Sequence, residues 1–346
     1  MKFNINKNFS GEIIFSDLKK LLQDFYGNND ISLIIDKNVA YPFDNYNHHS
    51  KLILDINENN KSLAVVEQIW QFLLEKNITK SHRIFIIGGG VLHDVAMFAC
   101  SVFKRGLNVI SVPTTLLAMV DAAIGGKNGI NYQHFKNIIG NIYLPQQNII
   151  VPDFLKTLPK EQVLSGWAEI LKIGLVSDKL FYHQCIEHLE KSILPNIDII
   201  QHAIQLKINI IQEDLYDNNK RQLLNFGHSI AHAIEGWYDE QDNYIPHGYA
   251  VAQGIITEAY ISTALSKLSK DDFNIISESI KKYLPLQKIK MSQIPFLLDK
   301  INQDKKNIPH EWQFTLLNSI GSAQIKVPVN RNIVENAVLN TFQIEQ

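Results

Sequence analysis

The stretch RIFIIGGGVLHDVAMFACSVFKRG, residues 83–106, decides the fold class. Its first part, RIFIIGGG (83–90), is rich in β-branched residues and predicts a buried strand that enters a glycine turn. Its second part, VLHDVAMFACSVFKRG (91–106), predicts a helix. A strand, a tight turn and a helix in this order are typical of a parallel sheet covered by helices.

The segments around this unit continue the same alternation. Further strands are predicted at 32–39, 51–56 and 107–115, and a helix at 61–77. From about Val151 the pattern becomes helical, without a convincing strand between the helices, and VPDFLKTLP (151–159) is the natural boundary. We therefore expect an α/β domain with a parallel, Rossmann-like sheet at residues 1–152, followed by an all-α domain at residues 153–346.

Composition excludes several classes of protein. The chain has 346 residues, of which 45% are hydrophobic, and its 33 basic residues nearly balance its 35 acidic ones. Without a basic patch, nucleic acid is not expected as a partner. Cys100 and Cys185 lie far apart and are expected to be reduced, buried thiols. No signal peptide or membrane span is recognisable, so we expect a cytoplasmic protein that does not bind membranes.

The glycine turn raises the question of a nucleotide. Consecutive glycines let the backbone approach a phosphate, and the next helix offers its N-terminal N–H groups. The sequence is not GxGxxG, however, and alone it fits a tight strand-to-helix turn equally well. Asp94 could accept a bond from a ribose hydroxyl, or could simply lie in the first helical turn, where acids are favoured.

A segment with polar, charged and glycine residues follows at 111–140. It combines Thr114, Thr115, Asp121, Lys127, Lys136 and Asn137 with four glycines. Cations on glycine-hinged loops suit a phosphorylated or carboxylated substrate, because they supply charge-assisted hydrogen bonds. For any single lysine, a solvated surface loop remains the simpler interpretation.

Histidines and a glutamate in the helical half suggest a metal. His228 and His232, four residues apart in NFGHSIAHAIEGW (225–237), share one face of a predicted helix. Spacing alone favours this pair as ligands, with Glu169 and His247 as further candidates for a catalytic zinc site. Core histidines bonded to the backbone would explain the pair equally well. Lys172 shares a helical face with Glu169 and could act on a substrate bound at the metal.

Taken in order, these motifs resemble those of the 3-dehydroquinate synthase family. The resemblance rests on GGGVxxD (88–94), VPTTLLAMVDAAIGGK (112–127), KN (136–137), AEILK (168–172), RQLLNFGHSIAH (221–232), HG (247–248) and DKK (304–306). It implies an NAD-dependent, zinc-containing lyase of the shikimate pathway, with cobalt as an alternative metal. Such an enzyme converts 3-deoxy-D-arabino-heptulosonate 7-phosphate to 3-dehydroquinate and phosphate. NAD⁺ takes a hydride from the substrate early in each turnover, and the NADH that forms later returns it, so no net NADH is produced.

The resemblance also implies roles for individual residues. The metal ligands would be Glu169, His228 and His247. His232, which the spacing of four favoured as a ligand, would not be one. NAD would contact Asp36, Glu58, Lys61, Gly89, Gly90, Val91, Asp94, Thr114 and Thr115, with Asp121, Lys127 and Lys136 serving it as well. The residues acting on substrate would be Asp121, Lys127, Lys172, Lys207, Arg221, Asn225 and His232. Its carboxylate or phosphate would meet Lys136, Asn137 and one of Lys305 and Lys306. Arg105 would reach the phosphate site of a neighbouring subunit, so a homodimer is implied.

Several positions depart from the family pattern. His93 and Met97 add bulk in the helix after the glycine turn, Leu215 replaces a carboxylate, and Phe135 replaces the glycine before Lys136. None of these is an implied ligand or substrate residue.

Three other functions compete with this interpretation. The first is another sugar-phosphate cyclase of the valiolone type, against which the retention of His232 and Lys127 argues. The second is a metal-dependent polyol dehydrogenase, which should lack the loop lysines and would turn over free NADH. A non-enzymatic metal- or nucleotide-binding regulator ranks last, because it would not explain why the cationic residues are retained.

Overall fold

The structure is a computed structural model that describes residues 2–6, 9–25, 30–46, 50–133, 135–241, 243–302 and 312–345. Internal contacts divide the chain into two units, Met1–Pro159 and Lys160–Gln346. Within the described residues, no helix combines the length and the apolar composition needed to cross a membrane.

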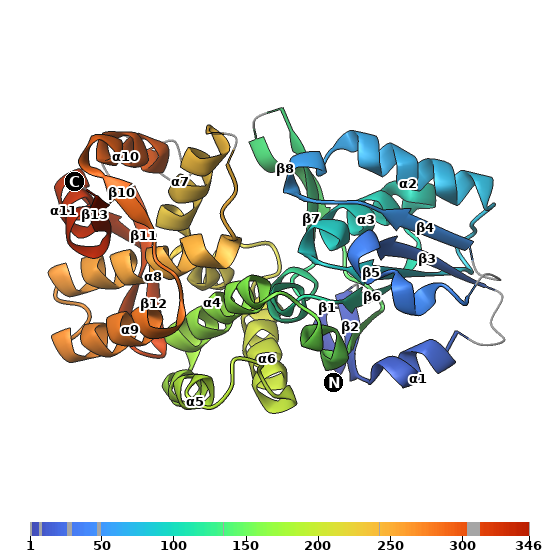
Figure 1. The fold of residues 1–346 in the computed structure, drawn as a ribbon, viewed down its shortest axis with the longest axis horizontal. Coiled ribbons are helices and arrows are strands. Elements are labelled where there is room, and N and C mark those ends of the chain that lie inside the picture. The colour runs from blue at the N-terminus through green and yellow to red at the C-terminus, as the bar shows by residue number, and fades with distance from the viewer. Residues whose placement is uncertain are drawn as a thin grey trace. The chain divides into compact units, whose positions relative to one another are not determined.

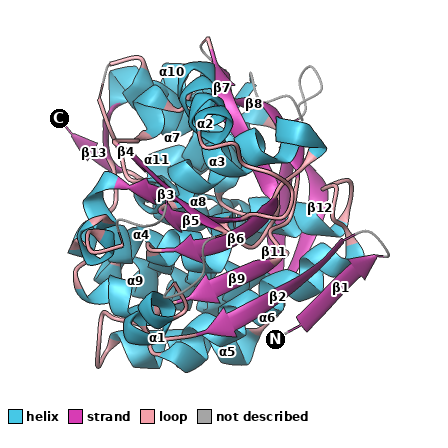
Figure 2. Cartoon of the chain, turned by 90° about the vertical axis from the view of Figure 1, so that its right-hand side faces the viewer, coloured by secondary structure: helices cyan, strands magenta, loops and turns pink. Residues whose placement is uncertain are grey.

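A sheet forms the centre of the N-terminal unit (Figures 1 and 2). Its strands are β1 (Lys2–Asn6), β2 (Phe9–Phe15), β3 (Ile31–Asp36), β4 (Ser50–Leu54), β5 (Arg83–Gly88), β6 (Asn108–Pro113) and β9 (Gln147–Ile150). Their order is β1-β2-β9-β6-β5-β3-β4, and only the edge strand β1 runs antiparallel to its neighbour. The expected parallel sheet is thus confirmed, with β1, β2 and β9 as strands that the sequence analysis did not identify.

Side chains alternate between two layers of helices on this sheet. Ile84 and Ile86 of β5 belong to a core cluster shared with α2 (Leu63–Glu75) and α3 (Gly90–Val102). Phe85, between them, points the other way and meets Phe25, which follows α1 (Leu18–Gln23), with ring centroids 4.9 Å apart. This period of two is the reason why a strand buried on both faces reads as a continuous apolar run.

The C-terminal unit is mainly helical. Its helices are α4 (Lys160–Ser177), α5 (Lys179–Leu189), α6 (Ile197–Glu213), α7 (His228–Asp239), α8 (His247–Ala264), α9 (Lys270–Tyr283), α10 (Ile294–Asn302) and α11 (Arg331–Thr341). Helix α8 is apolar around most of its circumference and packs against α4, α7, α9 and α11, as a central helix should.

The predicted helical character is confirmed, but this unit also contains short strands. β11 (Trp312–Ser319) pairs antiparallel with β12 (Ser322–Val329), and β10 (Lys288–Lys290) pairs parallel with β13 (Gln343–Glu345). β11 is buried along most of its length against α8. Its apolar run is too short to distinguish a strand from a buried helical segment by periodicity.

Candidate functional site

The carboxyl ends of three parallel strands gather the first group of candidate residues. β3 ends at Asp36, β5 at Gly88 and β6 at Pro113, and these strands are neighbours in the sheet. A Cβ on Gly88 would lie 2.7 Å from the Leu92 side chain and 2.9 Å from that of Asp36. The turn therefore requires glycine for close packing, and it leads directly into the N-terminus of α3, where backbone N–H groups favour a phosphate.

The other candidates of this edge lie on the same turns. Gly89 precedes α3, and Gly90, Val91 and Asp94 form its first turns. The Thr114 N–H donates to the Gly88 carbonyl at 2.9 Å, and the Thr115 hydroxyl accepts from the Ala118 N–H at 3.1 Å. Asp36 caps the turn after β3 by accepting from the Asn38 N–H at 2.9 Å.

The two bulky departures in α3 do not fill the turn. His93 is 1% exposed, and its Nδ1 lies 2.9 Å from the Gly89 carbonyl, which can only accept, so Nδ1 carries the proton. Burial lowers the pKa of His93 to about 4, although the bond to Gly89 opposes the shift, and the ring is neutral. Met97 is buried in the core cluster between α3 and the sheet. Both side chains support the helix that carries Asp94.

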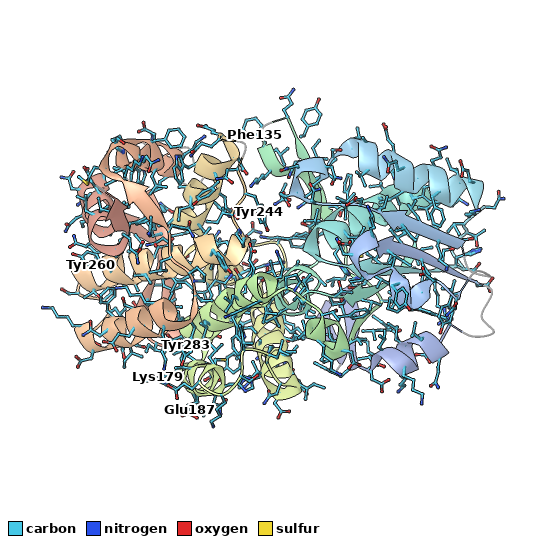
Figure 3. All side chains as sticks on the ribbon, in the orientation of Figure 1. Phe135, Lys179, Glu187, Tyr244, Tyr260 and Tyr283 are labelled. Carbon is cyan, nitrogen blue, oxygen red and sulfur yellow. The ribbon has the colours of Figure 1, made fainter. Side chains whose placement is uncertain are left out.

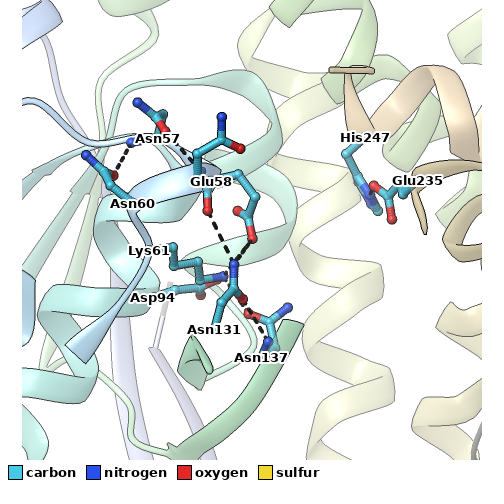
Figure 4. Close-up of polar contacts among 10 residues, drawn as sticks. Asn57, Glu58, Asn60, Lys61, Asp94, Asn131, Asn137, Glu235 and His247 are labelled. Atoms are coloured by element: carbon cyan, nitrogen blue, oxygen red, sulfur yellow. Dashed lines mark hydrogen bonds and ion pairs between the residues drawn. The ribbon is translucent and has the colours of Figure 1, made fainter. Parts of the chain in front are cut away.

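A buried ammonium group joins the next candidates. Lys61 is 3% exposed, and its Nζ lies 2.6 Å from Asp94 Oδ2 and 4.0 Å from Glu58 Oε1 (Figure 4). Burial raises the pKa of Asp94 to about 6; the Lys61 ammonium opposes this shift, and the Glu58 and Asp121 carboxylates add to it. Several acidic groups thus surround one buried cation, a polar cluster suited to the hydroxyls of a ribose.

The second half of the segment at 111–140 forms a hairpin, which corrects the expectation of a loop. β7 (Lys127–Tyr132) pairs antiparallel with β8 (Phe135–Ile142), preceded by a π-helical turn at Ala118–Ala122 that contains Asp121. Gly129 and Gly140 face each other across it, and a Cβ on Gly140 would lie 2.1 Å from the Asn128 carbonyl. These glycines therefore allow the two strands to approach closely, whereas the sequence suggested that they act as hinges of a loop.

The hairpin presents Lys136 and Asn137 near its tip. Both are exposed residues of β8, and Asn137 adopts a left-handed φ of 52°. Phe135, the departure from the family glycine, is 57% exposed at the start of the same strand (Figure 3). Its ring therefore lies outside the packed part of the unit.

Arg105 lies at an unusual turn after α3. Lys104, Arg105 and Gly106 have φ angles of 48°, 62° and 106°, three consecutive left-handed residues. Lys104 anchors the turn by donating to the Ile78 carbonyl at 2.6 Å. Arg105 is exposed. Such strain in non-glycine residues is often retained where function needs a particular geometry.

Three side chains of the C-terminal unit form a candidate metal centre. Glu169, His228 and His247 each offer a ligand atom, and these atoms lie within 4.8 Å of one another. His228 Nε2 lies 3.6 Å from Glu169 Oε1, and His247 Nε2 lies 3.3 Å from the same oxygen. The group is the one that the family resemblance implied, and two imidazoles with one carboxylate are a common ligand set for catalytic zinc.

Two of the three candidate ligands have pKa values that favour the form that binds metals. Glu169 is fully buried, with the Lys172 ammonium beside one carboxylate oxygen and His247 Nε2 3.3 Å from the other. Burial alone would raise the pKa of Glu169, but Lys172 and His247 outweigh it and hold the pKa at about 2. Burial lowers the pKa of His228 well below its ordinary value, and Lys172 adds to this. A carboxylate and a neutral imidazole are the forms that bind metals.

Glu235 holds the third ligand in place. Its Oε1 lies 2.8 Å from His247 Nδ1, which directs the other ring nitrogen toward Glu169. Burial lowers the pKa of His247, but Glu235 and Glu169 outweigh it and raise the pKa to about 10. A metal ion bound here would displace that proton, because a histidine must be neutral to act as a ligand. Carboxylates behind metal-binding histidines play this orienting role in many zinc proteins.

The segment read as one helix from Asn225 to Trp237 is broken. A 3-10 turn covers Lys220–Asn225, Gly227 has a left-handed φ of 82°, and α7 begins at His228. His232 is exposed, and its ring centroid lies 5.4 Å from that of His228, outside the three-residue group. Asn225 lines a polar cavity of about 210 Å³ together with Gln222, Ser229 and Thr315.

Buried cations accompany the metal centre. Lys172, Lys207 and Arg221 are 2%, 4% and 5% exposed, on α4, on α6 and in the 3-10 turn, which pack together. Arg221 donates to the Leu215 carbonyl at 2.7 Å, and the Leu215 side chain is buried. At position 215, where the family has a carboxylate, the backbone carbonyl of Leu215 therefore binds the Arg221 guanidinium. Lys305 and Lys306 lie outside the described residues.

Several residues that support the candidate site were not predicted from the sequence. Asn131 bonds to Glu58 and Asn137, Glu235 to His247, and Glu258 accepts from the first N–H groups of α7. Ser165 accepts from the Gly248 N–H at 2.9 Å, one residue after His247. Glu235 lies seven residues after His228, on the same helical face, which was a usable signal; the other contacts join residues distant in sequence.

Comparison with known proteins identifies the family. Residues 51–165 match the family described as "3-dehydroquinate synthase N-terminal", and residues 166–307 match "3-dehydroquinate synthase C-terminal". The chain is 32% identical to the 3-dehydroquinate synthase of Parabacteroides distasonis, over 95% of this chain and 96% of the relative. It is 37% identical to that of Picrophilus torridus, over 89% and 90% of the two chains.

Solved structures share the fold. The 2-epi-5-epi-valiolone synthase of Streptomyces hygroscopicus subsp. jinggangensis, with NAD+ and Zn2+ bound, is similar with a TM-score of 0.84 at 21% identity, covering 99% of both chains. A 2-deoxy-scyllo-inosose synthase complexed with carbaglucose-6-phosphate, NAD+ and Co2+ gives 0.85 at 21% identity, covering 98% of both. These likenesses concern fold, whereas the family matches concern sequence along most of the chain. The chain belongs to the 3-dehydroquinate synthase family.

Proposed function

We propose that this protein is a 3-dehydroquinate synthase that converts 3-deoxy-D-arabino-heptulosonate 7-phosphate to 3-dehydroquinate and phosphate. The observation that carries the proposal is the group of the buried Glu169 and the half-buried His228 and His247, with Lys172 beside it. A carboxylate and two imidazoles suit zinc or cobalt. The family membership of the whole chain supports the same conclusion.

The cofactors would supply chemistry that side chains lack. When bound, NAD accepts and returns a hydride, and a divalent metal makes a hydroxyl group more acidic. We propose that Glu169, His228 and His247 hold the metal, and that the N-terminus of α3, with the Lys61, Asp94 and Glu58 cluster, holds NAD. The glycine turn and the polar cluster support this assignment.

The chain's own residues would position a doubly anionic substrate. Lys172, Lys207 and Arg221 are cations enclosed by protein, and Lys127, Lys136 and Asn137 lie on the hairpin. Buried cations favour an anion strongly, because little water screens their charge. Held in one pose, a substrate with a carboxylate and a phosphate can pass through several steps without leaving. His232, near the centre but outside it, is proposed to move protons.

The polyol dehydrogenase alternative would release reduced cofactor, whereas a synthase returns it. A valiolone-type cyclase is the second alternative, since a valiolone synthase has the same fold. We also propose a homodimer in which the exposed Arg105 reaches the partner's phosphate site, as the family resemblance implies, and a cytoplasmic location.

One experiment separates these functions. Purified protein with NAD⁺ and Zn²⁺ is offered 3-deoxy-D-arabino-heptulosonate 7-phosphate or sedoheptulose 7-phosphate, and released phosphate and NADH absorbance are followed. We expect phosphate from the first substrate alone, no net NADH, and loss of activity with a chelator or in Glu169→Gln. Phosphate from the second substrate alone would favour a valiolone-type cyclase. No phosphate from either, with folded and metal-loaded protein, would contradict the proposal.

A further inference from the structure

Asn131 of β7 attaches the hairpin to the segment that carries Glu58 and Lys61. It lies where the hairpin ladder shifts register, between the pairs Ile130–Ile139 and Tyr132–Phe135. Its backbone N–H donates to the Lys61 carbonyl at 2.9 Å. The strand is therefore bonded to a different part of the unit at the position where its own pairing is irregular.

The side chain of Asn131 bonds in two directions (Figure 4). Nδ2 donates to Glu58 Oε1 at 2.8 Å and to the Glu58 carbonyl at 3.3 Å, while Oδ1 accepts from the Asn137 N–H at 2.9 Å. These partners fix the orientation of the amide, since Glu58 offers only acceptors here and the Asn137 N–H only donates. A carboxylate could not donate to Glu58, and an aliphatic side chain could do neither.

Lys61 closes this set of contacts into a ring. Its Nζ donates to Asn137 Oδ1 at 2.5 Å and to Asp94 Oδ2 at 2.6 Å. Asn137 is thus bonded through its backbone to Asn131 and through its side chain to Lys61. Lys61 itself is 3% exposed, so its ammonium is largely removed from water, although Asn137 is exposed.

The segment before Lys61 is itself held rigidly. The Asn57 side chain accepts from the Asn59 N–H at 3.0 Å, Asn60 Oδ1 accepts from the Asn57 N–H at 2.9 Å, and Asn60 Nδ2 donates to the Asp55 carbonyl at 2.8 Å. Glu58 therefore projects from a fixed turn. Movement of the hairpin relative to this turn would break several bonds together.

We propose that Asn131 is a positioning residue that couples cofactor binding to the placement of Lys136 and Asn137. The inference rests on the proposed function, in which Glu58, Lys61 and Asp94 contact NAD and the hairpin residues contact substrate. A ligand that fixes Glu58, Lys61 and Asp94 also fixes the hairpin through Asn131. By reciprocity, a substrate held by the hairpin strengthens cofactor binding by the same factor.

Hydrogen exchange of the hairpin amides tests this coupling without turnover. Exchange of Gly129, Ile130, Ile139 and Gly140 is measured with and without saturating NAD⁺, after the NAD⁺ Kd of each variant has been determined. In the wild type we expect NAD⁺ to slow exchange by roughly tenfold, equivalent to about 1.4 kcal/mol. In Asn131→Asp, which places a second carboxylate beside Glu58, we expect a ratio close to one.

Two further variants make the result specific. Asn131→Ala removes the same bonds without adding charge, and should also abolish the effect if the aspartate variant folds poorly. Asn141→Asp is the matched control on β8, because Asn141 donates to Ser101 of α3 at 2.6 Å and makes no contact with Glu58 or Lys61. It should lower thermal stability yet keep the NAD⁺-dependent slowing.

Each contrary outcome has a distinct meaning. Equal slowing in wild type and in both Asn131 variants, or no slowing in the wild type, would overturn the coupling. An Asn131 variant that no longer binds NAD⁺ would also overturn it, because Asn131 would then belong to the cofactor site itself. A wild type that fails to bind NAD⁺ contradicts the proposed function, whereas binding without hairpin protection contradicts only the coupling.

Discussion

His93 is a buried side chain that bonds to the glycine turn, and its protonation should affect the stability of the N-terminal unit. The ring is 1% exposed and bonded to the Gly89 carbonyl, and burial lowers its pKa to about 4. An unfolded histidine has a pKa near 6.5, so between these values the unfolded chain binds more protons than the folded one. Stability from this group is therefore complete above pH 6.5 and is lost as the pH falls toward 4.

A pH comparison tests this account. From pH 7 to pH 5, protonation of unfolded His93 should lower the free energy of unfolding by about 2 kcal/mol in the wild type. The His93→Asn side chain can still donate to the Gly89 carbonyl but does not titrate. Its free energy of unfolding should therefore fall by about 2 kcal/mol less between pH 7 and pH 5 than that of the wild type. Urea unfolding of both proteins at the two pH values measures the difference. If the free energy of unfolding fell equally with pH in the wild type and the variant, the pKa of His93 in the folded protein would be close to that in the unfolded chain, which would contradict this account.

Glu235 makes a prediction about metal affinity. In Glu235→Gln the amide oxygen can still accept from His247 Nδ1, but the negative charge that strengthens the imidazole as a ligand is lost. Zinc affinity, measured by competition with a chromophoric chelator, should fall by roughly 10- to 100-fold. Glu240→Gln removes a carboxylate paired with Lys300 just beyond the same helix, and should leave the affinity unchanged. Equal affinities for wild type and Glu235→Gln would exclude the orienting role.

Among the elements, α7 depends on a carboxylate supplied by another helix. Glu258 of α8 is fully buried and accepts from the N–H groups of Gly227, Ser229 and Ile230 at 2.6, 3.1 and 3.4 Å. A negative charge at a helix N-terminus also interacts favourably with the helix dipole. Because α7 begins at His228, this bond set fixes the metal ligand as well as the helix.

Removing this cap should therefore affect both properties. Glu258→Ala leaves several buried N–H groups without an acceptor and should cost about 2–3 kcal/mol of stability, with weaker zinc binding. Glu258→Gln keeps one acceptor oxygen and should cost less. Thermal unfolding and chelator competition measure the two effects, with the exposed Glu278→Gln of α9 as the control. Unchanged zinc affinity in a destabilised Glu258→Ala protein would limit the role of Glu258 to folding.

Sequence periodicity predicted the buried strands and helices, whose apolar residues form a recognisable pattern. It missed strands that are recognisable only from the neighbouring strand with which they pair. The runs at β3, β5 and β6 are apolar on both faces and were recognised, as was the helix over α2. β8 is exposed along most of its length and has no alternation to detect. The close approach that requires Gly140 becomes visible only when β7 is beside it.

The candidate metal centre shows the same limit. The spacing of four residues favoured His228 and His232 as a pair of ligands. The ligand atoms that lie together belong instead to Glu169, His228 and His247, and the two histidines follow Glu169 by 59 and 78 residues. Nothing local indicates that α4, α7 and α8 meet there. The motif order of a known family supplied that information. The left-handed Gly227, which lies between the 3-10 turn and α7, explains why a continuous helix was the wrong expectation.

At the scale of the whole molecule, the proposed site residues are divided between the two units. Glu58, Lys61, Asp94 and the hairpin residues belong to the first, whereas the metal centre and the buried cations belong to the second. Arg105 of the first unit is exposed in its turn of left-handed residues. The proposed homodimer gives it a role in the partner's site.

Heterodimers with differently tagged chains test that role. When one chain carries Arg105→Ala and the other Lys172→Met, one site keeps its own Lys172 and receives the partner's arginine, so roughly half of wild-type activity is expected. When one chain carries both substitutions and the other is wild type, neither site is complete and activity should be lost. If Arg105 instead serves its own chain, these two outcomes are exchanged, because the wild-type chain then retains a complete site. A protein that elutes as a monomer at micromolar concentration would contradict the shared site directly.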